Sequence, residues 1–152
     1  MPPTILTEIK QSKPFEQFQQ EVLVNLRRTA AVLTRQLENE FKPVGLTVTQ
    51  FNVLRIVRGA GAPGIVQADI AERLVADTPD VPRLVKRLED ASLVVRRSDP
   101  NDARVLIVTL SPKGRKTLKA IDKLLRSINH TFFANLSQAE LKTLNELLTK
   151  AR

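Results

Sequence analysis

The sequence predicts a mainly α-helical fold of the α+β class, on three observations. Apolar residues recur at every third or fourth position over most of the chain, which is the spacing of amphipathic helices. The apolar runs typical of strands occur only between residues 93 and 110. The chain has 152 residues, 42% of them hydrophobic, which suits one domain, or one small module with appended helices, around a packed core.

A long helix is expected over residues 15–41. Its apolar stripe, spaced mostly by three, four or seven, contains Phe15, Phe18, Val22, Leu26, Leu33, Leu37 and Phe41. Thr47 and Gln50 form a capping box that opens a second helix. Glycines and a proline over residues 59–64 then predict a loop.

Two short helices and a hairpin are expected next. The first helix covers about residues 67–74. The second, which Asp77 or Thr78 can cap, turns a row of apolar side chains inward: Val81, Leu84, Val85 and Leu88. Strands are expected over residues 93–97 and 105–110, joined by a polar turn. This order describes a helix-turn-helix with a wing, in which the second short helix can enter a DNA major groove about 12 Å wide.

Helices close the chain. Ser111 starts a long helix that continues to Phe132, and Ser137 with Glu140 opens a last helix over residues 138–150. The apolar stripes of the terminal helices allow two arrangements. They can pack on each other within one chain, or they can intertwine with a second copy, which would place two reading helices one duplex turn, about 34–36 Å, apart.

Positive charge is concentrated in the middle of the chain. The net charge is +8, and residues 78–119 hold 10 basic against 5 acidic side chains. A solvated face of mixed charge is one interpretation. The other is a surface for double-stranded DNA, because the inward residues of the second short helix leave Arg83, Lys86 and Arg87 on its other faces. Arginine can reach guanine edges or phosphates, whereas lysine mainly contacts phosphates.

Other classes of function find no support in the residues. Without cysteine the chain has no disulfide, thiol chemistry or thiolate metal site, and a lone histidine, His130, is seldom a metal ligand. Neither a nucleophile elbow nor a phosphate-cradling loop occurs, so we expect no enzyme, no cofactor and no metal. No apolar run approaches the roughly 18 residues of a membrane span. The first 15 residues carry Glu8, Lys10 and Lys13 and no apolar stretch, so we expect no secretory leader. We also expect no membrane partner, and a cytoplasmic, nucleoid-associated protein.

Five segments carry a family pattern, in order and at matching spacing. They are residues 46–54 (LTVTQFNVL), 67–74 (QADIAERL), 83–89 (RLVKRLE), 93–97 (LVVRR) and the wing 99–104 (DPNDAR), which leads to LSPKG at 110–114. Together they resemble the MarR family of bacterial transcriptional regulators. The resemblance implies a homodimeric winged helix-turn-helix protein that binds pseudo-palindromic operators, usually as a repressor that small aromatic or anionic ligands release.

The resemblance also divides the chain and assigns its residues. Residues 1–45 would be an N-terminal dimerisation helix, residues 46–112 the DNA-binding module, and residues 113–152 the C-terminal dimerisation helices. At the wing tip, Asp102 would orient Arg104, which would enter the minor groove; alternatively the two side chains only pair and stiffen the hairpin. The DNA-binding candidates are Thr78, Asp80, Arg83, Lys86, Arg87, Arg97, Asn101, Asp102 and Arg104.

The chain departs from the family pattern at the start of the second short helix. Pro79, Asp80 and Pro82 replace small hydroxyl residues. Pro82 is expected to delete the earliest helical hydrogen bond, while Asp80 could repel phosphate, cap the helix or accept from cytosine. Ser92 stands where a turn glycine is usual. Two alternatives therefore stay open: a sequence-tolerant architectural DNA-binding protein and a degenerate winged-helix interaction module.

A small effector, if there is one, would occupy the family's crevice between the dimerisation helices and the winged module. Its lining could draw on five residues: Arg27, Phe51, Leu54, Arg55 and Arg58. Each of them can equally be an ordinary core or surface residue.

Overall fold

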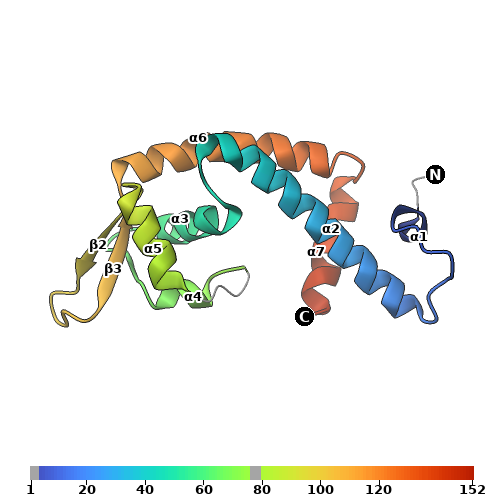
Figure 1. Ribbon diagram of the computed structural model, residues 1–152, viewed down its shortest axis with the longest axis horizontal. Helices are drawn as coiled ribbons and strands as arrows, with labels where there is room; N and C mark the ends of the chain where they lie inside the picture. Colours follow the sequence, from blue (N-terminus) through green and yellow to red (C-terminus); the bar gives the residue numbers. More distant parts are fainter. Residues whose placement is uncertain (1–3, 76–79) are drawn as a thin grey trace. The chain divides into compact units, whose positions relative to one another are not determined.

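The computed structural model describes residues 4–75 and 80–152 of a chain that divides into two compact units, residues 1–39 and 40–152 (Figure 1). The first unit holds a short helix, α1 (Ile5–Glu8), and most of α2 (Phe18–Phe41). The apolar spacing of the sequence does not predict α1. Glu8 of this helix forms an ion pair with Arg28 of α2, with 3.6 Å between Oε2 and Nε.

The second unit confirms the predicted mainly helical fold with a winged helix-turn-helix. In chain order its elements after α2 are η1 (Lys42–Val44), α3 (Val48–Ala60), β1 (Ile65–Val66), α4 (Asp69–Glu72), α5 (Val81–Asp90), β2 (Val94–Ser98), β3 (Leu106–Leu110), α6 (Pro112–Phe132) and α7 (Gln138–Lys150). The capping boxes predicted for α3 and α7 are both present. None of the described helices is long and apolar enough to cross a bilayer.

A small antiparallel sheet forms the wing, in the strand order β1-β3-β2. β1 is not predicted from the sequence, because its two residues are too few to show an alternating pattern. Gly64 allows this strand to pair: its φ is +113°, and a Cβ there would lie 2.6 Å from the Val108 carbonyl oxygen. The loop before β1 begins later than predicted, because α3 continues through Gly59 to Ala60.

The core of the second unit lies between α3, α5, α6 and the sheet. α3 packs on β3 and α6, and α5 packs on β2 and α3. Its fully buried side chains include Leu54, Ile70, Val85, Leu88, Val94, Val108, Leu118 and Ile121. Phe41, the last residue of α2, also belongs to this unit and contacts the Phe51 ring edge to face, at 5.2 Å between centroids. The sheet and α5 are therefore held by one apolar core.

Candidate nucleic-acid interface

α5 lies beside the hairpin of β2 and β3 (Figure 1), and its exposed residues form a cationic face. Val81, Val85 and Leu88 are buried, as the predicted periodicity requires. Arg83, Lys86 and Arg87 are all exposed on the remaining surface of the helix. Lys86 forms an ion pair with Asp90, with 3.0 Å between Nζ and Oδ1. Among the described residues, neither arginine side chain has a hydrogen-bond or ion-pair partner, so both guanidinium groups can contact a ligand outside the chain.

At the start of α5, Asp80 caps the helix, which is one of its expected roles, whereas Pro82 does not have the expected effect. Asp80 is the N-cap, and its Oδ1 accepts a hydrogen bond from the Arg83 backbone N–H at 3.0 Å. The expected loss of a helical bond at Pro82 is wrong. The earliest such bond runs from the Leu84 N–H to the Asp80 carbonyl, so Pro82 lies in the first turn, where its nitrogen needs no helical partner. Thr78, with Asp77 and Pro79, lies outside the described residues.

The end of α5 is fixed to the sheet by backbone and side-chain bonds. The Leu93 N–H donates to the Leu88 carbonyl and the Ser92 N–H to the Glu89 carbonyl, which is a Schellman motif with Ser92 in the left-handed conformation (φ +61°). The Arg96 Nε donates to Glu89 Oε2 at 2.9 Å across the turn. Hydrogen bonds from this guanidinium lower the pKa of Glu89 below its ordinary value. Arg96, one of the basic residues of the 78–119 segment, therefore holds β2 against α5.

The wing tip presents Arg104 on a carboxylate support. Asp102 Oδ1 accepts from the Arg104 backbone N–H at 3.0 Å and from its Nε at 3.1 Å. These bonds lower the pKa of Asp102, the side-chain bond from Arg104 contributing most. Asp99 accepts from the Asn101 N–H at 2.7 Å, which shapes the turn ahead of it. Asn101, Asp102 and Arg104 therefore lie together at the tip of the wing, and their contact with DNA stays a prediction.

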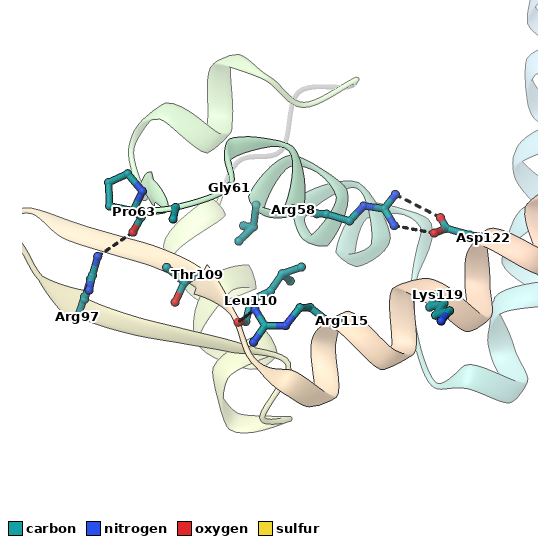
Figure 2. Close-up of a pocket in the computed structure, with 11 residues that line it drawn as sticks. Arg58, Gly61, Pro63, Arg97, Thr109, Leu110, Arg115, Lys119 and Asp122 are labelled. Atoms are coloured by element: carbon teal, nitrogen blue, oxygen red, sulfur yellow. Dashed lines mark hydrogen bonds and ion pairs between the residues drawn. The ribbon is translucent and has the colours of Figure 1, made fainter.

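Arg97 is not brought together with the other DNA-binding candidates. Its neighbour Arg96 faces α5, and successive strand side chains point to opposite faces of a sheet. Arg97 lies on the other face, where its Nη2 donates to the Pro63 carbonyl oxygen at 2.8 Å (Figure 2). Side chains alternate between the two faces of β2, so the direction of Arg97 follows once Arg96 is known to contact Glu89.

The start of α6 supports the end of α5, a role that the sequence analysis does not anticipate. The Ser111 Oγ donates to the Ser92 carbonyl oxygen at 2.6 Å, and the Lys113 Nζ donates to the Ala91 carbonyl oxygen at 2.8 Å. Gly114 lies so close to the turn that a Cβ there would overlap the Leu93 carbonyl oxygen. The segment from Leu110 to Gly114 therefore packs against the end of α5.

The five effector candidates are spread over different environments. Phe51 and Leu54 are buried in the core, and Arg27 and Arg55 are exposed. Arg58 lines a pocket of about 670 Å³ between the end of α3, the loop before β1, β3 and α6 (Figure 2). It binds Asp122 of α6 with two hydrogen bonds, of 2.7 and 3.2 Å. The predicted crevice stays a prediction.

The helices α3 to α5, the antiparallel wing and the cationic α5 face define a winged helix-turn-helix protein. The sequence pattern of the MarR family matches residues 44–105. The multiple antibiotic resistance protein MarR of Salmonella typhimurium is 31% identical over 117 residues, which cover 76% of this chain and 80% of that protein. The chain belongs to the MarR family of transcriptional regulators.

Solved structures agree with this assignment. A MarR variant from E. coli, crystallised with operator DNA, has a TM-score of 0.78 and 25% identity, covering 90% of this chain and 99% of that chain. BpsR of Bordetella bronchiseptica, described with regulation of its DNA binding by 6-hydroxynicotinic acid, has a TM-score of 0.76 and 28% identity, covering 86% of this chain and 98% of that chain.

Proposed function

We propose that this MarR-family regulator acts in the cytoplasm, at the nucleoid, where it binds a pseudo-palindromic operator as a homodimer, with α5 in the major groove and Arg104 in the minor groove. The observation that carries the proposal is the exposed α5 cation pair, Arg83 and Arg87, next to a wing whose Arg104 side chain is 91% exposed. The E. coli relative solved with operator DNA supports operator binding, and helix-turn-helix proteins generally place their second helix in the major groove.

The homodimer accounts for apolar surface that one chain leaves exposed. Within the first unit, α2 exposes a stripe of large apolar side chains, with Phe18 at 74% and Leu23 at 57%, and Val22 and Leu26 also exposed. Leu147 of α7 is exposed as well. Contiguous apolar surface of this kind marks an interaction site. A second copy would cover it and carry the second reading helix.

Sedimentation of an α2 variant tests the homodimer. Leu23→Glu with Leu26→Glu is expected to convert a dimer to a monomer or to an unfolded chain, because the stripe could no longer be buried without unpaired charge. Gln20→Glu, an exposed polar position on the same helix, is expected to leave the mass unchanged. A native chain that sediments as a monomer at micromolar concentration contradicts the proposal.

Affinity for the promoter of its own operon, compared with random duplex across a range of salt, tests operator recognition. A specific regulator is expected to bind the promoter about 10³-fold tighter or more. Nearly equal, steeply salt-dependent affinities would indicate the architectural alternative, and negligible binding to both would indicate the interaction module. We favour the regulator because Asp80 is engaged as the N-cap and Pro82 removes no helical bond, so neither disturbs the reading face.

Repression and release by a small ligand complete the proposal. The BpsR relative, described with 6-hydroxynicotinic acid, supports a ligand-responsive protein. Reporter transcription from the promoter of its own operon is measured with and without the chain. It is expected to fall when the chain is present.

A further inference from the structure

The outer face of α6 carries a row of positive charge that is separate from α5 and the wing. Residues three, four and seven positions apart lie on the same face of a helix. At this spacing α6 holds four exposed side chains, which we call the basic row: Lys116, Lys119, Lys123 and Arg126. By the helical repeat, the basic row lies on the side of α6 opposite the buried Leu118 and Ile121, and it therefore faces solvent.

No carboxylate within the described residues neutralises the basic row. Asp122 is the one acidic residue in the sequence of α6, and its two oxygens accept from the Arg58 guanidinium at 2.7 and 3.2 Å. The four side chains of the row have no hydrogen-bond or ion-pair partner in residues 4–75 and 80–152. The row therefore differs from a solvated face of mixed charge, in which opposite signs alternate.

This arrangement of charge works against the stability of α6 in the free protein. Like charges three or four residues apart destabilise a helix, and cations in the first turn oppose the helix dipole. The first five residues of α6 include Lys113, Arg115 and Lys116 and no acidic residue. An extended anion that lies along the row would relieve both effects.

The basic row fits a DNA backbone better than a protein or a membrane. Duplex DNA presents an unbroken line of charge, one per about 1.7 Å of its axis, and non-specific contact with it needs only cations. Residues 116–126 span about 15 Å of helix, so the row faces several phosphates. No large apolar side chain of α6, a helix described over its whole length, is exposed to anchor a protein segment. A membrane-surface helix inserts its apolar face, whereas that of α6 is buried in the core.

A straight duplex along α5 and the wing does not reach the basic row. α3 packs against both α5 and α6. Figure 1 shows α6 along one edge of the second unit, with α4 and the tip of the wing along the opposite edge. Because the row lies on the side of α6 turned away from the core, it points away from α4 and the wing tip. The row is therefore a second, separate surface.

We propose that the basic row of α6 binds the phosphate backbone of a second DNA duplex segment, without reading its sequence, while α5 and the wing hold the first. The chain then bridges two duplexes, or two distant sites of one DNA molecule. This inference goes beyond the proposed function, because it adds a DNA surface that operator recognition does not use.

Capture of a second duplex by the full chain tests the proposal. A random duplex is fixed on beads, the chain is bound to it, and a labelled random duplex is offered at about 50 mM salt. The native chain is expected to retain the labelled duplex. A row variant, with Lys116→Gln, Lys119→Gln and Lys123→Gln, is expected to bind the beads but retain about tenfold less labelled duplex. Glutamine has nearly the helix propensity of lysine, so α6 should still form.

Two further variants show that the effect belongs to the row. The control variant combines Lys10→Gln, Lys13→Gln and Lys150→Gln, which removes the same charge from exposed positions outside α6. It is expected to retain the labelled duplex as the native chain does. Arginine at the three lysine positions of the row keeps the charge and is expected to keep the capture.

A chain with a disabled α5 face separates the row from the proposed function. Arg83→Ala, Arg87→Ala and Arg104→Ala together should leave measurable binding of random duplex by fluorescence anisotropy, through the row. Each phosphate contact contributes about −0.9 to the slope of log affinity against log salt, so adding the row substitutions should reduce its magnitude by about 2–3. No operator is needed, and a failure of operator recognition therefore leaves this result unaffected.

Four results would overturn the proposal. Capture that persists in the row variant would assign bridging to the α5 faces of two chains, and an equal loss in the control variant would assign it to net charge. Absence of random-duplex binding by the α5-disabled chain at about 50 mM salt would show that the row does not bind DNA. If that chain binds polyglutamate more tightly than duplex, the partner of the row is an acidic protein instead.

Discussion

The Asp102 carboxylate holds the Arg104 guanidinium out from the tip of the wing. Oδ1 accepts from the backbone N–H and from Nε, and Oδ2 accepts from Nη2 at 3.3 Å. The backbone bond stiffens the turn, while the side-chain bonds fix the direction of a group that stays exposed. One geometry is thus compatible with both roles considered from the sequence, and the affinity for DNA distinguishes them.

Arg104→Ala is expected to weaken operator binding by several-fold to about a hundredfold, as the loss of one groove arginine would. The thermal midpoint should stay within about a degree, because the side chain is solvated. Asp102→Asn, which keeps the shape but removes the charge, is expected to cause a smaller loss. Fluorescence anisotropy at physiological salt measures the operator affinity of the native chain and of both variants. If Arg104→Ala binds as the native chain does, the pair only stiffens the hairpin.

Arg83→Ala is expected to reduce discrimination between operator and random DNA, because this guanidinium lies near the start of α5, without a partner among the described residues, and can reach base edges. Lys86→Ala is the control on the same helix. Since Lys86 is paired with Asp90 and lysine contacts phosphates, it should weaken binding to both duplexes by similar, smaller factors. An equal loss on both duplexes for Arg83→Ala would make it a phosphate contact.

Glu89 and Arg96 are expected to stabilise the unit as a pair. Glu89→Gln and Arg96→Met should each destabilise it by about 1–2 kcal/mol near neutral pH, and the double variant by less than their sum. The folded-state pKa of Glu89 is lowered, so the contribution is present above the ordinary glutamate pKa, about 4.3. It is lost as the pH falls through the lowered value. Urea unfolding at neutral and at acidic pH measures this, and additive losses would contradict the pairing.

Local signals predict most of the fold, whereas the contacts between elements are beyond them. The boxes at Thr47 and Ser137, the two long strands and the buried face of α5 follow from spacing alone. The ion pair of Arg58 with Asp122 joins residues 64 positions apart, so no local pattern contains it. Likewise, the family resemblance groups Arg97 with the DNA-binding candidates, but the direction of its side chain depends on which face of β2 meets α5.

Ser92→Gly is expected to stabilise the chain by about 1 kcal/mol. Ser92 has φ +61°, a conformation in which any Cβ clashes with the following carbonyl and glycine does not. The Ser92 carbonyl, which accepts from Ser111, is kept in the variant. Ser92→Ala keeps the Cβ and should therefore be close to neutral. Urea unfolding compares the three chains, and equal stability of the glycine and alanine variants would show that the turn carries no strain.

Gly114→Ala is expected to destabilise the chain by about 1–3 kcal/mol, because the new methyl group would overlap the Leu93 carbonyl oxygen and α6 would have to move away. Gly59→Ala is the matched control, since Gly59 lies in α3 and a methyl group added there would meet no described atom within 4 Å. That variant should gain about 0.5–1 kcal/mol from helix propensity. The thermal unfolding midpoints of the two variants should shift in opposite directions. A Gly114→Ala chain as stable as the native one would mean that this close approach of α6 does not hold the end of α5.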